Sequence, residues 1–273
     1  MGSLLVSEVM MRDYPRIDKD DSLERALEVM EDYDLDRVVV FDEGRLVGVM
    51  TKKDIMMKLA KLRTRLWSTG RLHVSNFMTP NPKTISASEP LAKAAIVMAE
   101  EDIGSLPVVS GEDVVGLVTR LEASFVLRDR SDIRALDVMR TLPEALKETH
   151  KVLHARQLLL RYDTPFLPVV DEAGRPVGYV TIDIIADAFI AFYKRVPEKY
   201  RKERIEHLLV ADIMRLRPPS VAPDTPLPEV IRVIGERRSK GVIVLHNNRI
   251  VGIITLHDLV RYAARLAQSH GEV

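Results

Sequence analysis

The chain has 273 residues, and its 40 Lys and Arg side chains balance its 40 Asp and Glu side chains, so the formal net charge is zero. A balanced charge gives no general attraction for nucleic acid or for an anionic membrane surface, and any anion site must therefore be local. The absence of Cys excludes disulfide bonds and thiolate metal sites, and it favours a reducing cytoplasm as the location.

The first predicted helix begins after Ser22, which can cap it, and its apolar residues fall at helical spacing. A buried strand is predicted at 38–41, a turn at 42–45 and a second strand at 46–50, which together indicate a hairpin. Thr51 then begins a second helix, whose apolar face is predicted to be Ile55, Leu59, Leu62 and Leu66. The block reads strand–helix–strand–strand–helix, and its apolar side is too large for one block to bury alone.

The same order of elements follows three more times along the chain. The corresponding first helices are predicted at 88–98, 153–160 and 227–234, and the strands after them at 106–109, 167–170 and 242–245. Pro107 and Pro168 lie inside two of these apolar runs. Because proline cannot donate to a strand ladder, we expect both to mark an edge or the mouth of a strand.

Two markers define the repeat independently of these elements. Each block opens on a short segment that ends in Met and closes on Gly-apolar-apolar-Thr. The openings end at Met10, Met78, Met139 and Met214, and the closings begin at Gly48, Gly116, Gly178 and Gly252. Both intervals vary together along the chain, so the repeating unit is a whole supersecondary block. We place the four repeats at 1–70, 71–131, 132–198 and 199–273.

Two charged segments connect the repeats. Residues 196–207 separate repeats 3 and 4, and the basic segment 61–73 contains the single Trp of the chain, Trp67. We interpret both as solvated extensions of helices. The basic stretches 61–71 and 194–204 also motivate an alternative function, in which the chain is a partner-binding or nucleic-acid-binding scaffold with vestigial clefts.

The pattern resembles the cystathionine-beta-synthase (CBS) domain family. The opening of the DVM type, the LPVV strand and the closing G-x-apolar-T-x-x-D carry this resemblance in four copies, over roughly residues 4–265. The resemblance implies an α/β (α+β) fold of β-α-β-β-α repeats that pair into two pseudo-twofold modules, 1–131 and 132–273. Each repeat of that family contributes a cleft for an adenosine-containing ligand. Four repeats in one chain look similar to the regulatory gamma subunit of AMP-activated protein kinase and to stand-alone prokaryotic relatives.

The closing motif can bind an anion or a ribose for reasons of its own. A Thr between a strand and a helix places a hydroxyl and free backbone N–H groups at a helix N-terminus. A carboxylate three residues later can accept hydrogen bonds from ribose hydroxyls. The pairs are Thr51 and Asp54, Thr119 and Glu122, and Thr255 and Asp258. The alternative is that they are only capping boxes. Repeat 3 departs from the pattern, since Ile184 stands at the acidic position and Asp183 lies one residue early.

Candidate contacts for the rest of a nucleotide surround these pairs. Cations that follow the closing Thr or the opening Met are candidates for phosphate, namely Lys52, Lys53, Arg120, His257, Arg12, Arg140 and Arg215. We expect protonation of His257 to make phosphate binding sensitive to pH near neutrality. The candidates for the adenine side are Arg16, Ile17, Arg37 and Val38 in repeat 1, Thr84, Ile85, Gly104, Ser105, Leu106 and Pro107 in repeat 2, and Ser220, Val221, Gly241, Val242 and Ile243 in repeat 4.

These observations predict a regulatory, energy-sensing protein that is not an enzyme and that binds AMP, ADP, ATP or S-adenosylmethionine. The seven His residues show no metal-ligand spacing, and no phosphate-binding P-loop string is present. We therefore predict neither a catalytic cofactor nor a metal. No apolar run approaches the roughly 18 residues of a membrane span. Besides the nucleotide, we expect either a homodimer or a regulated protein as partner, and neither nucleic acid nor a membrane.

Overall fold

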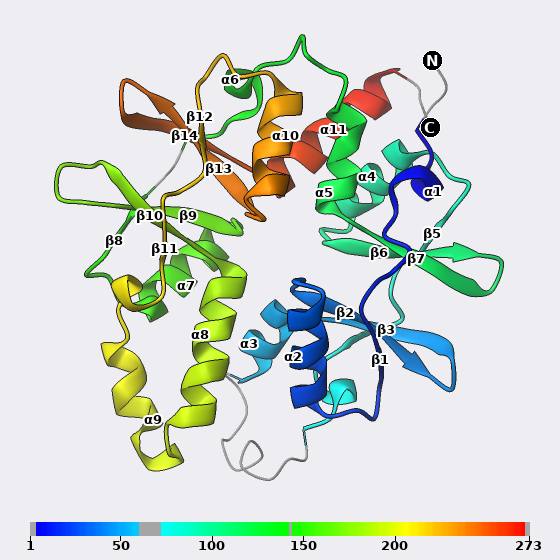
Figure 1. Ribbon diagram of the computed structural model, residues 1–273, viewed down its shortest axis with the longest axis horizontal. Helices are drawn as coiled ribbons and strands as arrows, with labels where there is room; N and C mark the ends of the chain where they lie inside the picture. Colours follow the sequence, from blue (N-terminus) through cyan, green and yellow to red (C-terminus); the bar gives the residue numbers. More distant parts are fainter. Residues whose placement is uncertain (1–3, 60–71, 142–143, 271–273) are drawn as a thin grey trace.

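The four repeats lie around a common centre in the computed structural model, which describes residues 4–59, 72–141 and 144–270 (Figure 1). Repeats 1 and 2 form the right half of this view, and repeats 3 and 4 form the left half. The predicted helix positions Leu62 and Leu66, and Trp67 with most of the basic segment before repeat 2, lie outside the described residues.

Repeat 1 has the predicted order of elements. Its sheet contains β1 (Arg16–Asp18), which pairs in parallel with β2 (Arg37–Asp42), and β3 (Arg45–Thr51), which is antiparallel to β2. Between β1 and β2 lies α2 (Leu23–Asp32), and α3 (Lys52–Leu59) follows β3. Ser22 caps α2 as predicted, because its hydroxyl accepts a hydrogen bond from the backbone N–H of Arg25 at 3.1 Å.

The other repeats have the same order with elements of different length. Repeat 2 consists of β5 (Ile85–Ser86), α4 (Leu91–Glu100), β6 (Ser105–Ser110), β7 (Asp113–Thr119) and α5 (Arg120–Ala123). Repeat 3 consists of β8 (Leu146–Lys147), α7 (Val152–Arg161), β9 (Phe166–Val170), β10 (Pro176–Thr181) and α8 (Ile182–Arg195). Repeat 4 consists of β12 (Ser220–Val221), α10 (Leu227–Glu236), β13 (Gly241–His246), β14 (Arg249–Thr255) and α11 (Leu256–His270). The predicted α/β fold of four β-α-β-β-α repeats is confirmed.

The two strand prolines occupy central strands rather than edge strands. Pro107 lies in β6 and Pro168 in β9, and each strand has a neighbour on both sides. Their parallel neighbours β5 and β8 begin to pair only one residue later, at Val108 and Val169. Each proline therefore sits at the mouth of its strand, where the ladder on one side has not begun and no N–H is needed.

The segments that open the repeats are exchanged between neighbours. The opening of repeat 2 contains η2 (Val74–Asn76) and β4 (Thr79–Pro80), and β4 pairs antiparallel with β3 of repeat 1. In return the opening of repeat 1, with α1 (Val6–Val9), reaches β7 of repeat 2 through a bridge between Met11 and Leu117.

Repeats 3 and 4 exchange their openings in the same way. The opening of repeat 4 contains η5 (Val210–Asp212) and β11 (Arg215–Leu216), and β11 extends the sheet of repeat 3 beside β10. The opening of repeat 3, with α6 (Ala135–Val138), bridges β14 of repeat 4 through Arg140 and Ile253.

The exchange brings the two sequence markers into contact. Each closing Gly lies under the opening Met of the neighbouring repeat, so that an added Cβ would meet a methionine sulfur. These distances are 2.7 Å from Gly48 to Met78, 2.8 Å from Gly116 to Met10, 2.9 Å from Gly178 to Met214 and 2.9 Å from Gly252 to Met139. Real Cβ contacts are not this short, so the closing position requires a residue without a side chain.

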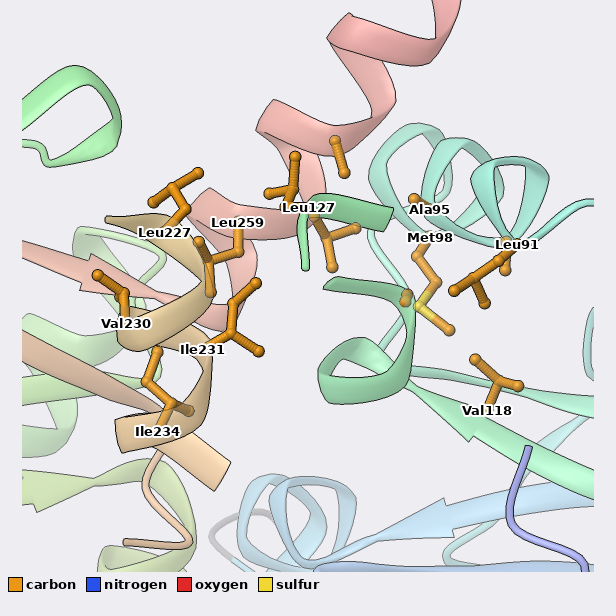
Figure 2. Packing of buried hydrophobic residues seen from close by; sticks show 14 of the residues in the cluster. Leu91, Ala95, Met98, Val118, Leu127, Leu227, Val230, Ile231, Ile234 and Leu259 are labelled. Atoms are coloured by element: carbon orange, nitrogen blue, oxygen red, sulfur yellow. The ribbon is translucent and has the colours of Figure 1, made fainter. Parts of the chain in front are cut away.

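Packing between helices closes the ring of repeats. The largest core joins repeats 2 and 4, where α4 lies against α11 and Leu91, Ala95 and Met98 of α4 face the same interior as Leu227 and Ile231 of α10 (Figure 2). On the opposite side α3 of repeat 1 contacts α8 of repeat 3. Every repeat therefore packs against one other through exchanged strands and against another through helices.

The charged segment between repeats 3 and 4 forms a helix of its own. The helix α8 ends at Arg195, and α9 (Glu198–Arg204) begins after Pro197. The segment is therefore a separate helix rather than the predicted extension of α8, because proline favours a new helix start over continuation. Among the helices that the structure describes, none combines the length and the apolar character needed to cross a membrane.

Candidate functional site

A cavity of about 470 Å³ lies where the four repeats meet. Each repeat contributes charged side chains to its wall. They are Asp36, Arg37, Lys53 and Asp54 from repeat 1, Lys83, Asp102 and Arg120 from repeat 2, Asp163 from repeat 3, and Lys240 and His257 from repeat 4. The cavity therefore has cations and carboxylates from all four repeats in a wall that also contains apolar side chains such as Leu35, Leu159 and Ile182.

Asp54 enters this cavity from the first turn of α3. One of its oxygens, Oδ2, accepts hydrogen bonds from the Thr51 N–H at 2.9 Å and from the Thr51 hydroxyl at 2.6 Å. These are the bonds of a capping box, so that interpretation is physically present. They occupy one oxygen only, and no other donor contacts the Asp54 carboxylate among the described residues. The remaining oxygen is available to a ligand.

Repeat 2 contributes residues to the same cavity as Asp54. Because β4 pairs with β3, Thr79 and Asn81 are brought beside repeat 1 and line this cavity together with Asp54. Gly104 and Ser105, at the start of β6, also line it. The acidic position of repeat 1 and the strand start of repeat 2 thus line one cavity, and no single repeat builds it alone.

A partly buried ion-pair group joins repeats 1 and 4 at the cavity. Asp36 binds Arg37 at 2.9 Å and Lys240 of repeat 4 at 3.0 Å. Burial opposes ionisation of Asp36, but the two cations outweigh it and hold the pKa of the Asp36 carboxyl well below its usual range. The Nη1 of Arg37 is buried without a hydrogen-bond partner, and it lies 2.9 Å from where a Cβ of Gly104 would be. This guanidinium therefore keeps an unused donor beside the cavity.

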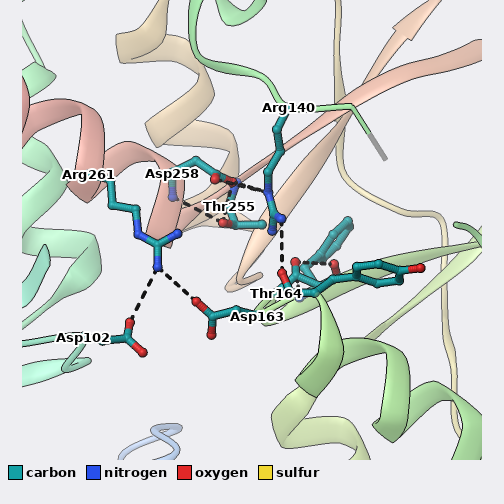
Figure 3. A network of polar contacts seen from close by, with 9 residues as sticks. Asp102, Arg140, Asp163, Thr164, Thr255, Asp258 and Arg261 are labelled. Carbon is teal, nitrogen blue, oxygen red and sulfur yellow. Dashed lines mark hydrogen bonds and ion pairs between the residues drawn. The ribbon is translucent and has the colours of Figure 1, made fainter. Parts of the chain in front are cut away.

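A second charged group joins repeats 2, 3 and 4 (Figure 3). Arg261 of α11 lies 3.0 Å from Asp163 and 3.9 Å from Asp102, and Arg120 lies 3.1 Å from Asp102. Burial and the nearby Arg37 lower the pKa of Arg120 to about 10. Asp102, Asp163 and His257 could in principle hold a metal, since their ligand atoms lie within 4.8 Å of one another. Two arginines already neutralise both carboxylates, so we assign no metal there.

His257 lies beside this group and is only 7% exposed. Neither of its ring nitrogens has a hydrogen-bond partner among the described residues. Burial, together with the positive charge of Arg120, lowers the pKa of His257 to about 3. The prediction that His257 titrates near neutrality is therefore wrong, because the imidazole is neutral throughout that range.

Asp258 of repeat 4 has a different neighbour from Asp54. Its Oδ2 accepts hydrogen bonds from the Thr255 N–H at 2.8 Å and the Thr255 hydroxyl at 2.6 Å, as in repeat 1. In addition, the Nε of Arg140 lies 3.2 Å from both carboxylate oxygens (Figure 3). Arg140 belongs to repeat 3 and reaches Asp258 because the openings are exchanged.

Comparison with known proteins assigns all four repeats. The CBS domain matches residues 6–61, 74–128, 135–191 and 210–265. The chain belongs to the CBS domain family.

Similar proteins agree with this fold. Protein MJ1225 of Methanocaldococcus jannaschii, which is described as a candidate archaeal homolog of g-AMPK, has a crystal structure with a TM-score of 0.77 at 20% identity, over 95% of this chain and 99% of that one. An uncharacterized conserved protein of Pyrococcus horikoshii gives a TM-score of 0.62 at 20% identity, over 95% of this chain and 100% of that one. At this identity the likeness shows the CBS fold alone.

Curated relatives match part of the chain. Uncharacterized protein MJ1404 of M. jannaschii is 34% identical over 45% of this chain and 31% of its own length. An inosine-5'-monophosphate dehydrogenase of Korarchaeum cryptofilum is 31% identical over 39% of this chain and 22% of its own length. This chain thus spans less than a third of the length of either relative, and what they share with it is the CBS region.

The structure gathers only some of the predicted CBS site residues at the cavity. Those that line it are Arg37, Thr51, Asp54, Gly104, Ser105, Thr119, Arg120 and His257, together with Lys53. Several others point into the cores because alternate side chains of a strand face opposite sides. The buried ones away from the cavity are Ile17, Val38, Ile85, Leu106, Pro107, Val221, Gly241, Val242, Ile243 and Thr255.

The remaining predicted residues have other positions or partners. Lys52 forms an ion pair with Asp187 of repeat 3 at 2.8 Å, and Arg16 lies over the Phe41 ring at 4.5 Å. Glu122 is buried and accepts hydrogen bonds from Thr119, so its carboxylate acts as a helix cap. Away from the cavity, Thr84 and Ser220 are exposed, and Asp258 lies beside Arg140.

Sequence reasoning missed several cavity residues. They are Asp36, Thr79, Asn81, Lys83, Asp102, Asp163 and Lys240. A signal for two of them was available, because Asp34, Asp102 and Asp163 follow the first helix of repeats 1, 2 and 3 and all have positive φ, between 44° and 49°. The signal in the sequence was the recurrence of an Asp just after the first helix of three repeats, a residue type that tolerates the left-handed conformation found there.

Proposed function

We propose that this chain is a non-enzymatic regulatory protein that binds one or more adenine nucleotides between paired CBS repeats. AMP, ADP, ATP and S-adenosylmethionine are the candidate ligands. The observation that carries the proposal is Asp54, whose carboxylate has one oxygen bonded to Thr51 and one open to the cavity. A helix cap alone would not require a 470 Å³ cavity around it.

The cavity wall matches the parts of a nucleotide. The open oxygen of Asp54 can accept hydrogen bonds from the vicinal hydroxyls of a ribose. Lys53, Arg120 and the unpartnered Nη1 of Arg37 offer cationic donors for phosphate oxygens. The backbone at Gly104 and Ser105 offers a close approach for the edge of the base.

Regulation follows from where this cavity lies. We propose that the repeats act as two modules, 1–131 and 132–273, because the openings are exchanged within each of these halves. Lys240 and His257 of the second module line the cavity that holds Asp54 of the first. A ligand there contacts both modules, so it favours the arrangement of modules to which it binds more tightly. A second copy of the chain or a regulated protein would bind one arrangement of the modules in preference to the other. A cytoplasmic location is consistent with the Cys-free sequence.

The nucleic-acid scaffold receives less support. Of the basic segments that motivated it, residues 61–71 lie outside the described residues. In α9, the Arg201 side chain donates to the carbonyl oxygens of Tyr193 and Val196 instead of projecting freely. An arginine that satisfies its own backbone is poorly placed to bind phosphates of a nucleic acid.

Thermal unfolding with and without AMP tests the proposal. A ligand at about a hundred times its dissociation constant adds about 2.7 kcal/mol, or a rise in Tm of roughly 5–10 °C for a chain of this size. We expect Asp54→Ala to remove most of this rise. The variant also loses about 1 kcal/mol without ligand because the helix cap is lost, so the ligand-induced rise in Tm is the quantity to compare.

Asp183→Ala is the matched control, since Asp183 lies in the first turn of α8 of repeat 3 but outside the cavity. It should leave the AMP-induced rise in Tm unchanged. An Asp54→Ala variant that keeps the full rise, and differs from the original only without ligand, would show that Asp54 is a helix cap and nothing more.

A further inference from the structure

The residue after each opening Met occupies one equivalent place in all four repeats. Its carbonyl oxygen lies close to where a Cβ of the neighbouring closing Gly would be. These distances are 3.1 Å for Thr79 at Gly48, 2.8 Å for Met11 at Gly116, 2.8 Å for Arg215 at Gly178 and 2.9 Å for Arg140 at Gly252. The closing Thr and the acidic residue follow this Gly in the chain. The side chain of the residue after the Met therefore determines which group contacts the acidic side chain of the neighbouring repeat.

In repeat 4 the carboxylate meets an arginine. The Nε of Arg140 is 3.2 Å from both oxygens of Asp258, one of which also accepts two hydrogen bonds from Thr255. The Nη1 of Arg140 donates to the Tyr162 carbonyl oxygen at 3.4 Å, which anchors the guanidinium at a second point (Figure 3). The Asp258 side chain is only 12% exposed. Oδ2 thus accepts three hydrogen bonds, and Oδ1 lies 3.2 Å from the same Arg140 Nε, so the guanidinium stands against both oxygens.

In repeat 1 the equivalent place holds a short, uncharged residue. Thr79 lies beside Val49 in the ladder between β3 and β4, and no ion pair to Asp54 occurs among the described residues. Thr79 and Asp54 both line the central cavity. The two repeats that keep Asp therefore differ at the position after the opening Met of the neighbouring repeat, and there one carboxylate is open and the other is covered.

We propose that Arg140 closes the Asp258 cleft to a ribose, so that the chain binds a nucleotide at Asp54 but not at Asp258. This inference rests on the proposed function, since it concerns which clefts accept the nucleotide. The physical reason is competition for the same acceptor. Arg140 brings a full positive charge to the Asp258 carboxylate and is also held by the Tyr162 carbonyl oxygen, whereas a ribose hydroxyl is neutral, so a diol does not displace Arg140 at equal geometry.

Arg140→Thr places the residue found at position 79 beside Asp258 and tests the inference directly. Protein freed of bound ligand by unfolding and refolding is titrated with AMP in a calorimeter, and the number of AMP molecules bound per chain is compared with that of the original chain. We expect Arg140→Thr to bind one more. Arg140→Thr combined with Asp258→Ala should return to the original number, and Asp258→Ala alone should not change it. In the reverse exchange, Thr79→Arg should abolish binding at Asp54.

The outcomes separate this inference from the proposed function. If the original chain binds AMP and Asp258→Ala loses one bound molecule, the Asp258 cleft is open and the inference is overturned while the function stands. If Arg140→Thr weakens AMP binding without changing the number of AMP molecules bound per chain, Arg140 contacts the ligand and does not block the Asp258 cleft. That result also overturns the inference. If neither the original chain nor any variant binds AMP or S-adenosylmethionine, the proposed function itself fails.

Discussion

Replacing Gly116 by alanine should lower the free energy of unfolding by about 2 kcal/mol, which is the usual cost of forcing one extra carbon into a filled core. The new Cβ would lie 2.8 Å from the Sδ of Met10 and 2.8 Å from the Met11 carbonyl oxygen. The sulfur can move, but the carbonyl cannot move freely. Met11 and Leu117 exchange two backbone hydrogen bonds of 2.9 Å at this point, and any shift of the Met11 backbone strains both. Equilibrium urea unfolding measures the effect.

Gly235→Ala in α10 is the control for this substitution. A Cβ at Gly235 would have only ordinary contacts, 3.9 Å from the δ carbons of Leu121. Alanine in a helix interior is favoured over glycine by about 0.5–1 kcal/mol, so this variant should be more stable than the original. If Gly116→Ala proves as stable as the original chain, the contact between opening Met and closing Gly does not constrain the fold as we describe.

The second large effect is a loss of stability in acid that depends on His257. In the unfolded chain the His257 pKa returns to about 6.5, whereas in the folded chain it is about 3. Between these values the unfolded state binds a proton that the folded state does not, so stability falls as the pH falls. Above pH 6.5 His257 is neutral in both states and costs the folded chain no stability. Below pH 6.5 the free energy of unfolding decreases steadily as the pH falls toward 3. Between pH 7.5 and pH 5 the expected loss is about 2 kcal/mol.

The His257→Gln variant isolates this contribution from the other titrating groups. Glutamine carries no charge at any pH, so the variant should lose about 2 kcal/mol less than the original chain over the same pH interval. Urea unfolding at pH 7.5 and at pH 5 for both proteins gives the difference. Equal losses in the two proteins would mean that His257 is protonated as readily when folded as when unfolded.

The order of elements could be predicted from the sequence because it depends on local patterns. The Ser22 cap, the hairpin turns and the alternation of strand and helix within a block all follow from residues close together in the chain. The repetition of the Met and Gly markers then located all four blocks. These signals do not say which copy of Met meets which copy of Gly, so the exchange of openings could not be read from them.

The candidate site was predicted in part for the same reason. Asp54 and Arg120 could be found because each lies within a repeated motif. Arg140 was recognised as a cation that follows an opening Met, but the carboxylate that it covers belongs to another repeat. The pKa of His257 was wrongly predicted because it is lowered by burial and by the charge of Arg120, which comes from another repeat. Packing between repeats determines the charges that surround each group in this cavity, and a single motif contains no information about that packing.

The exchanged openings also determine what can fold while the chain is being synthesised. When residue 70 leaves the ribosome, the sheet of repeat 1 still lacks β4, and Met10 has no Gly116 to cover. Domains generally fold as they emerge, in order from the N-terminus. Here the first unit with all of its strand pairs is the product of residues 4–127, twice the length of one repeat. A gene truncated between repeats 1 and 2 would yield a sheet with an unpaired edge at β3, which is a template for aggregation.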